Sequence, residues 1–195
     1  MVIGLTGGIG SGKTTAAKLF ETMGCMIYNS DEKAKEVYFN ALVKEQVVAL
    51  LGEKAYSNPA TLNKAYISDK IFSNEQLLLQ LNAIIHPAVK NDFDKFAQQF
   101  AQRIIIKESA ILFETGIYKD LDATILIVAP LEERMKRVMK RSAASRSDVE
   151  MRMKSQWMDE VKIPLANYLL HNTKSQALIP QALSILNQLN SHVKA

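Results

Sequence analysis

The sequence is short of the residues that mark disordered, fibrous and disulfide-stapled chains. Its 195 residues include only 8 glycines, 5 prolines and one cysteine. So few glycines and prolines argue against disorder and against fibrous repeats. The single cysteine, Cys25, excludes an internal disulfide. Because Cys25 lies in an apolar run, we interpret it as a small buried hydrophobic residue.

Long apolar runs and strong net charge are also missing. No stretch approaches the roughly 18 apolar residues of a membrane span, and MVIGLTGGIG at the N-terminus has neither the basic segment nor the long apolar core of a secretory signal. We therefore expect a cytoplasmic protein with no membrane partner. The formal charge is only +4, with basic residues gathered between 134 and 154. This favours one local anionic ligand over nucleic acid.

What the sequence does contain is an alternation of short apolar runs and longer segments of helical period. Runs rich in Ile, Val, Leu and Tyr predict strands at residues 2–5, 25–28, 104–113, 123–128 and 168–170. Helices are predicted between or after them at residues 12–23, 130–140 and 176–189. Apolar strands separated by helices are typical of a covered parallel sheet, so we expect an α/β fold with a five-stranded parallel sheet.

The stretch from residue 31 to about 102 differs from the rest. It shows several helical patterns and no convincing strand, with interruptions at SNPA (57–60) and HPAV (86–89). We expect a helical subdomain inserted between the second and third strands. The chain is then a single domain, 1–195, with its core at 1–30 and 103–195.

A glycine-rich stretch follows the first predicted strand and opens a predicted helix. Within LTGGIGSGKTT, Gly7, Gly12, Lys13 and Thr14 match G-x-x-x-x-G-K-[ST], the P-loop pattern. Glycine lets backbone N–H groups approach phosphate oxygens with no Cβ in the way. Lys13 is expected to reach the β- and γ-phosphates, and Thr14 to offer its hydroxyl to Mg²⁺. A plain glycine-rich turn is the alternative, although a chance match to the whole pattern is rare.

The P-loop alone does not separate small-molecule kinases from switches, motors and transporters. A regulatory GTPase should carry N-K-x-D and D-x-x-G, and neither pattern occurs in the sequence. An ATP-driven motor usually carries further modules, for which 195 residues leave little space. A small-molecule kinase fits better.

Such a kinase must keep water from the transferred phosphate, usually with a mobile lid that carries arginines. Arg134, Arg137 and Arg141 recur on one face of a predicted helix. Guanidinium groups bind phosphate oxygens bidentately, so we predict catalytic roles for Arg137 and Arg141, next to a lid at about residues 141–156. For Arg134 we favour a solvated basic face.

Asp31 follows the second strand, where the chain enters the helical insert. Ligands of open α/β folds bind beyond the carboxyl ends of strands, so this carboxylate could take the proton of an acceptor hydroxyl. The alternative is a helix N-cap formed by Ser30 or Asp31. The spacing leaves both interpretations open.

Together these features resemble the dephospho-CoA kinase family over almost the full length. The resemblance rests on LTGGIGSGKTT, the Asp of YNSD, LQLNAIIHP, ILFETG, DATILIVAP, the spacing of Arg137 and Arg141, RMKSQ and ANYLLHN. It implies a P-loop NTPase three-layer sandwich with a helical acceptor-binding insert and a lid. It also implies transfer of the ATP γ-phosphate to the ribose 3′-hydroxyl of dephospho-CoA, the last step of coenzyme A synthesis.

The resemblance also implies roles for individual residues. The nucleotide-binding residues would be Gly8, Ile9, Gly10, Ser11, Gly12, Lys13, Thr14, Thr15 and Asn172. The acceptor side would include Asp31, His86 and Glu114, with Glu114 near the acceptor or the metal shell. His86, which precedes Pro87, could equally be a helix-end residue. Asn29 and Glu108 replace residues that are often Asp in the family, which leaves the carboxylate of the metal shell open.

The implied co-substrate and cofactor are ATP and Mg²⁺, and the implied partner is dephospho-CoA. We expect a monomer, with a homo-oligomer left open. Two alternatives remain: another P-loop kinase, for a nucleoside monophosphate or a short metabolite, and a nucleotide-dependent binding module with slow hydrolysis.

Overall fold

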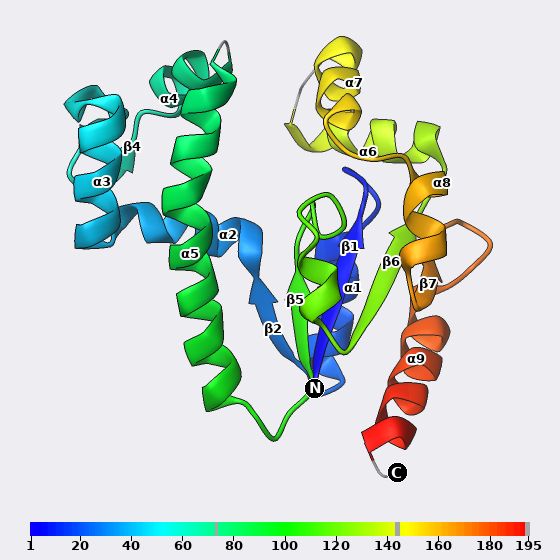
Figure 1. The fold of residues 1–195 in the computed structure, drawn as a ribbon. Helices are drawn as coiled ribbons and strands as arrows, with labels where there is room; N and C mark the ends of the chain where they lie inside the picture. The colour runs from blue at the N-terminus through cyan, green and yellow to red at the C-terminus, as the bar shows by residue number, and fades with distance from the viewer. Residues whose placement is uncertain (73, 143–144, 194–195) are drawn as a thin grey trace. The chain divides into compact units, whose positions relative to one another are not determined.

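The chain folds into two compact units, which Figure 1 shows as a ribbon. The computed structural model describes residues 1–72, 74–142 and 145–193. Unit 1 consists of Met1–Asn29 and Phe100–Ala195, and unit 2 is Ser30–Gln99. Each unit has its own hydrophobic core. The description of the chain as one domain with an insert and a lid stays a prediction.

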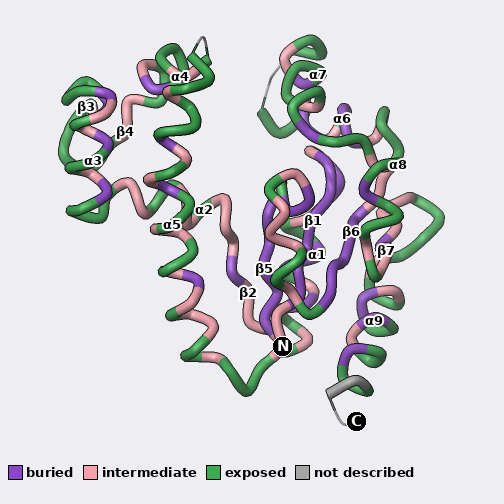
Figure 2. Tube along the Cα trace, viewed as in Figure 1, coloured by how far each residue is buried: buried purple, intermediate pink, exposed green. Residues whose placement is uncertain are grey.

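Unit 1 is built on a five-stranded parallel sheet of order β2-β5-β1-β6-β7. Its strands are β1 Val2–Gly7, β2 Met26–Asn29, β5 Ile105–Glu108, β6 Ala123–Val128 and β7 Tyr168–His171. Figure 2 shows the central strands β5, β1 and β6 as largely buried. The predicted α/β fold with a five-stranded parallel sheet is confirmed. Because β1 is the middle strand, the loop that follows it begins at the centre of the carboxyl edge.

Helices of unit 1 follow the strands. They are α1 Lys13–Thr22, α6 Leu131–Ser142, α7 Arg146–Lys154, α8 Asp159–Lys162 and α9 Leu178–Val193, with 3₁₀ turns η3 Ile117–Asp120 and η4 Ile163–Leu165. The three helices predicted from the sequence correspond to α1, α6 and α9, with ends shifted by a few residues. Helix α7 begins at a capping box, in which the Ser145 side chain and the Asp148 side chain each bond the other's backbone N–H.

The two faces of β1 are covered differently, because successive side chains of a strand point to opposite faces. Ile3 and Leu5 are fully buried in one core with residues of α1 and α9, among them Ala16, Phe20, Ala182 and Ile185. Gly4 faces the other side, where a Cβ would lie 2.5 Å from Leu112 Cδ2 and 2.7 Å from Leu121 Cδ1. The segment after β5 therefore packs directly on the central strand.

Strand β5 ends sooner than the sequence predicts. The strand expected at residues 104–113 stops at Glu108, and the following residues form turns. Leu112 and Phe113 are still buried, at 0% and 1% exposure. An apolar run shows that residues are buried, but it does not distinguish a strand from a packed turn.

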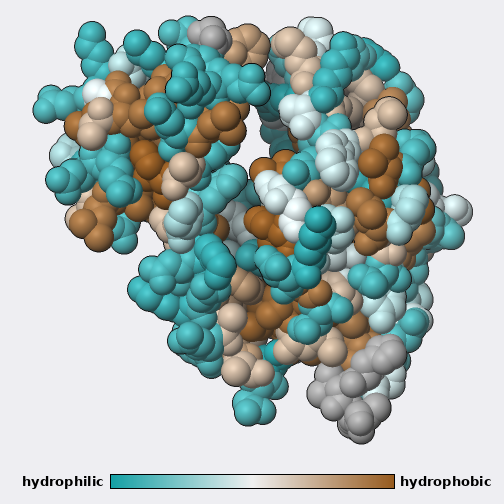
Figure 3. Space-filling model, viewed as in Figure 1, coloured by the Kyte–Doolittle hydropathy of each residue, from teal (hydrophilic) through white to brown (hydrophobic). Residues whose placement is uncertain are grey.

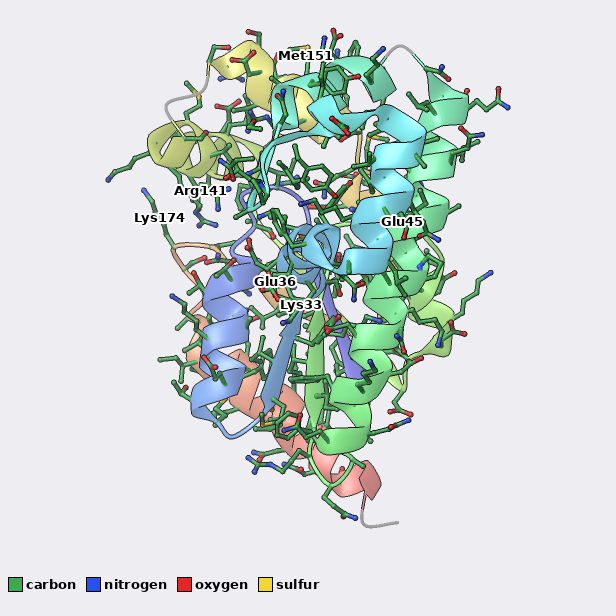
Figure 4. The ribbon with its side chains drawn as sticks, turned by 90° about the vertical axis from the view of Figure 1, so that its left-hand side faces the viewer. Lys33, Glu36, Glu45, Arg141, Met151 and Lys174 are labelled. Carbon is green, nitrogen blue, oxygen red and sulfur yellow. The ribbon has the colours of Figure 1, made fainter. Side chains whose placement is uncertain are left out.

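Unit 2 is mainly helical. It contains α2 Ser30–Glu36, η1 Val37–Phe39, α3 Ala41–Leu51, η2 Glu53–Ala55, β3 Tyr56–Asn58, β4 Thr61–Leu62, α4 Lys64–Phe72 and α5 Glu75–Gln99. Its core is formed by Val43, Val47, Leu51, Ala55, Ile67, Leu81 and Ile85. The charged pair Lys33 and Glu36 lies on the exposed side of α2 (Figure 4).

Two expectations for this unit were wrong. The sequence showed no strand here, yet β3 and β4 form an antiparallel pair, whose turn is stabilised by Asn58 Oδ1 accepting from Ala60 N–H. Helix α5 runs through Pro87, where an interruption was expected. Proline removes one backbone bond from a helix interior. Buried residues on both sides of it, Ile85 and Phe93, keep the helix packed.

Large hydrophobic side chains also remain exposed on the surface. Leu42, Phe72 and Leu79 are among them, and Figure 3 shows hydrophobic residues in several groups between hydrophilic ones. Single exposed hydrophobic residues are normal for folded proteins. Within the part of the chain that the structure describes, no helix has both the length and the apolar character to cross a membrane.

Candidate functional site

The loop between β1 and α1 is shaped by backbone conformations that glycine adopts easily. Gly10 and Gly12 have φ angles of 79° and 104°, in the region where other residues are strained. Ser11 N–H donates to Gly8 O at 3.0 Å, which closes the turn. The side chain of Lys13 folds back so that Nζ donates to Gly7 O at 3.0 Å. The loop thus carries an ammonium group to the N-terminus of α1, which itself favours anions.

Neighbouring protein atoms explain why this loop has no side chains at three of its glycines. A Cβ on Gly8 would overlap the guanidinium of Arg134, and a Cβ on Gly10 would overlap the Arg134 carbonyl oxygen. A Cβ on Gly12 would overlap the side-chain amide of Asn172. Close approach of a phosphate is therefore not the only reason for these glycines.

A buried carboxylate lies beside the hydroxyl of Thr14. Glu108 ends strand β5 and is 4% exposed. Its Oε1 lies 3.5 Å from Thr14 Oγ1, and its Oε2 accepts from Asn29 Nδ2 at 3.2 Å. A carboxylate next to a hydroxyl is the kind of oxygen ligand set that Mg²⁺ prefers. Glu108, which the sequence left open, therefore fits a magnesium site together with Thr14.

Arg137 on α6 lies against the P-loop. Its Nη1 is 3.4 Å from both Gly10 O and Ser11 O, and its Nη2 donates to Asn172 O at 3.2 Å. Nη2 also pairs with Glu133 at 3.0 Å. Asn172 in turn donates from Nδ2 to Ser11 O at 2.7 Å. Arg137 and Asn172, two predicted site residues that lie far apart in the sequence, thus meet at the P-loop.

Arg134 contradicts the solvated face expected for it, because it is only 9% exposed. Its Nε donates to Ile9 O at 3.1 Å, and its Nη1 pairs with Asp159 Oδ2 at 3.0 Å. The physical reason is that this face of α6 packs on the P-loop, where Ile9 lies against the buried cluster of Met135, Val138 and Val149. Helical spacing shows which residues share a face, but not what that face touches.

Arg141 is exposed near the end of α6. Figure 4 shows Arg141 and Lys174 on the same side of unit 1, Lys174 coming from the turn after β7. The predicted lid at residues 141–156 includes positions 143–144, which lie outside the described residues. Helix α7 beyond them packs on α6 through Val149.

The predicted acceptor residues Asp31 and His86 both lie in unit 2. Asp31 is in the first turn of α2, not at its N-cap. Among the residues described, the Ser30 hydroxyl has no hydrogen-bond partner, so Ser30 does not cap the helix through its side chain. His86 is an exposed residue in the interior of α5, which excludes the helix-end interpretation. The roles of Asp31 and His86 toward an acceptor stay predictions.

Glu114, also predicted on the acceptor side, has structural partners. Its Oε1 accepts from Trp157 N–H at 3.0 Å and lies 2.7 Å from Nζ of Lys162, whose side chain is fully buried. These contacts fasten the segment from Trp157 to Lys162, which contains α8, to the turn after β5. The carboxylate beside Thr14 is Glu108, and contact of Glu114 with an acceptor stays a prediction.

Gln156 and Lys162 were given no role from the sequence. Gln156 Oε1 accepts from Ile9 N–H at 2.8 Å, and its Nε2 donates to Ala110 O at 2.8 Å. Gln156 stood out only as the last letter of RMKSQ, and nothing in the pattern marked Lys162 as buried. Single polar residues without a repeat carry no spacing signal.

The family model, the curated relatives and the solved structures that match this chain agree with one another. Residues 1–177 match the family model described as dephospho-CoA kinase. A dephospho-CoA kinase of Bacteroides fragilis is 37% identical over 186 residues, which cover 94% of this chain and 90% of that protein. The structure of TT1252 from Thermus thermophilus is 33% identical, with a TM-score of 0.88 and 97% of both chains covered. A dephospho-CoA kinase from Campylobacter jejuni, 23% identical with a TM-score of 0.71 over 98% of both chains, shares the fold.

Proposed function

Since the chain belongs to the dephospho-CoA kinase family, we propose that it transfers the γ-phosphate of ATP to the ribose 3′-hydroxyl of dephospho-CoA. The products are coenzyme A and ADP. The observation that carries the proposal is the P-loop itself, with Lys13 folded over it and Glu108 beside Thr14.

ATP is the co-substrate that the family implies. Backbone N–H groups of residues 8–15 bind its phosphates, except that of Ile9, which donates to Gln156, and Lys13 binds the β- and γ-phosphates. Asn172, bonded to the P-loop at Ser11, lies beside the adenine. Phosphoryl transfer has a loose transition state, so these groups act mainly by positioning the phosphates and neutralising their charge.

Thr14 and Glu108 hold the Mg²⁺ of the reaction. When bound, the ion neutralises charge on the β- and γ-phosphates. Asn29 supports this site by donating to the Glu108 oxygen remote from Thr14, which fixes the orientation of the carboxylate.

The acceptor side consists of Asp31, His86 and Glu114. Asp31 takes the proton of the ribose hydroxyl as it attacks. Arg137 and Arg141 offset the negative charge that spreads over the transferred phosphoryl group. Arg137 already lies against the P-loop carbonyls. Its guanidinium becomes free for phosphate when it releases these carbonyls together with Asn172 O and Glu133.

The family is consistent with a small-molecule substrate, and we propose that the protein acts in the cytoplasm as a monomer without a nucleic-acid or membrane partner. The basic residues then serve the phosphates of the two substrates. Sedimentation of the purified chain would show a monomer mass if this is right.

The test is an incubation of purified protein with ATP, Mg²⁺ and dephospho-CoA, followed by mass detection of coenzyme A. ADP release should match coenzyme A formation, and AMP and pantetheine should respond weakly. Lys13→Ala should lower kcat by about 10²-fold or more, whereas Lys18→Ala, an exposed lysine on the same helix, should behave as wild type. A faster reaction with AMP would favour another kinase, and ATP binding without acceptor-stimulated turnover would favour a binding module.

A further inference from the structure

One residue of the P-loop is held through both its N–H and its C=O by side chains from outside the loop. Ile9 N–H donates to Gln156 Oε1 at 2.8 Å, and Ile9 O accepts from Arg134 Nε at 3.1 Å. The Ile9 side chain packs against the cluster of Met135, Val138 and Val149, which belong to α6 and α7. Three independent contacts therefore fix a residue that lies between Gly8 and Gly10.

Gln156 is itself held at both ends of its amide. While Oε1 accepts from Ile9, Nε2 donates to Ala110 O at 2.8 Å, and the residue is 9% exposed. Rotation of the side chain would break both bonds at once. The amide thus ties the P-loop to the turn after β5, two residues beyond Glu108.

Arg134 is oriented by a second contact of its guanidinium. Nη1 pairs with Asp159 Oδ2 at 3.0 Å, and the two side chains are only 11% and 17% exposed. The group lies over Gly8, where a Cβ would overlap it. A paired and largely buried guanidinium has little freedom to leave Ile9.

Such bonds matter because a glycine-rich loop has many accessible conformations when nothing holds it. Phosphate binding requires most of its N–H groups to converge on the ligand, so any ordering done in advance lowers the cost of binding. The N–H of Ile9 points away to Gln156 and has its own acceptor.

We propose that Gln156 and Arg134 are positioning residues that preorganise the P-loop for the phosphates of ATP. Neither residue needs to touch the nucleotide. The role rests on the proposed binding of ATP at this loop.

The test compares ATP affinity in two substitutions that retain size. Gln156→Met removes both amide bonds, and Arg134→Lys keeps the charge but not the two-sided geometry of the guanidinium. Since one net hydrogen bond corresponds to about a five- to tenfold change in an equilibrium, each should raise the Kd for ATP by about that factor. Calorimetry measures the Kd, and steady-state kinetics should show a raised KM for ATP with kcat and the KM for dephospho-CoA nearly unchanged.

The double variant adds a second readout. Both residues act on the peptide groups of Ile9, so their effects should not multiply. The proposal is supported if the double variant has a Kd for ATP close to that of the single variant that binds ATP less tightly. Full multiplication of the two factors would show that the residues act separately and would contradict it.

Asn167→Ala is the matched control. Asn167 Oδ1 accepts from Thr124 N–H at 2.9 Å, a bond of the same kind at the amino edge of the sheet. This variant should lower Tm but leave the Kd for ATP unchanged. The proposal fails if Gln156→Met binds ATP like wild type. It also fails if Asn167→Ala, at the same loss of Tm as Gln156→Met, weakens ATP binding by the same factor as Gln156→Met.

The two proposals can fail separately. Conversion of dephospho-CoA by the wild type tests the proposed function. The ratio of ATP affinities between variant and wild type tests the positioning role, whatever the acceptor turns out to be.

Discussion

Thr14 Oγ1 lies 3.5 Å from Oε1 of Glu108, where helix α1 begins and strand β5 ends. Asn29 Nδ2 donates to the other oxygen of the same carboxylate at 3.2 Å. The carboxylate is therefore held in place by an amide and turned toward a hydroxyl. This relationship depends on the register in which Asn29 and Leu5 flank Glu108 on neighbouring strands.

The first prediction concerns the charge of Glu108. Glu108→Gln keeps the size and an oxygen for Asn29 but removes the negative charge that attracts Mg²⁺. We expect kcat at low Mg²⁺ to fall by about 10²-fold, a typical loss for one electrostatic group, and to recover partly as Mg²⁺ is raised. Titration of activity with Mg²⁺ measures this, with Glu21→Gln on the exposed side of α1 as the control. A lowered kcat that ignores Mg²⁺ concentration would exclude a metal role for Glu108.

Asp31 gives the second prediction. If it accepts the proton of the acceptor hydroxyl, Asp31→Asn should lower kcat by about 10² to 10⁴-fold, the usual contribution of a general base. The neighbouring Glu32→Gln should change kcat little, because Glu32 pairs with Lys35 on the exposed side of α2. Steady-state kinetics decide the matter, and wild-type turnover by Asp31→Asn would remove the base from the mechanism.

The sheet and the P-loop could be predicted from sequence because their signals are local. Buried parallel strands appear as continuous apolar runs, and β6 at Ala123–Val128 has the predicted ends. The G-x-x-x-x-G-K-[ST] pattern contains its own geometry, since the positive φ of Gly12 and the helix that starts at Lys13 are adjacent. Such features need no knowledge of distant residues.

Other features depend on contacts between distant residues and could not be predicted. Arg134 and Gln156 reach Ile9 across separations of 125 and 147 positions. Helix α5 continues through Pro87 because its packing outweighs the local cost of proline. Glycine-rich loops are read as ligand sites, yet the space beside Gly8 is filled by the guanidinium of Arg134.

The close approach of the Arg134 guanidinium to Gly8 leads to the third prediction. Gly8→Ala places a methyl group where the Arg134 guanidinium lies, so Arg134 must leave Ile9. We expect a lower Tm and a Kd for ATP raised by about tenfold, as after loss of a charge-assisted hydrogen bond. In an Arg134→Met background the same Gly8→Ala change should have a much smaller effect. Equal effects in the two backgrounds would mean that Gly8 is required for the phosphates alone.

The fourth prediction concerns the buried pair of Lys162 and Glu114. Their charged atoms are 2.7 Å apart, with side chains 0% and 13% exposed. Lys162→Met leaves a carboxylate in the interior without its counter-charge and should lower the free energy of unfolding by about 3–5 kcal/mol. Adding Glu114→Gln should recover part of that loss, because the amide oxygen still accepts from Trp157 N–H.

Urea unfolding measures these stabilities, and the exposed pair Lys90 and Asp94 is the control. Its side chains are 71% and 47% exposed, so Lys90→Met should cost less than about 1 kcal/mol. The single variant Glu114→Gln also tests the predicted acceptor contact. A KM for dephospho-CoA equal to that of wild type would leave Glu114 a purely structural residue.

The last prediction concerns the pH dependence that Cys25 adds to stability. Burial raises the pKa of the Cys25 thiol from its usual 9.0 to about 11, although the nearby Arg103 works in the opposite direction. Between these two values the unfolded chain has released the thiol proton while the folded chain still holds it. Rising pH therefore favours the unfolded state in this window. Cys25→Ala removes the effect, so wild type should lose stability relative to the variant between about pH 9 and pH 11.

Two measurements check the behaviour of Cys25. Urea midpoints of wild type and Cys25→Ala, taken at several pH values, should move apart in that window and stay parallel below it. Alkylation by iodoacetamide at neutral pH should be slow in the folded protein and fast in urea, because the thiolate is the reactive form and the folded chain holds little of it. The prediction is contradicted if the difference between the midpoints stays constant with pH, or if iodoacetamide labels the folded chain rapidly. Either result would show that the thiol ionises as freely as in solvent. The buried position of Cys25 in the core of unit 1 would then not control its chemistry.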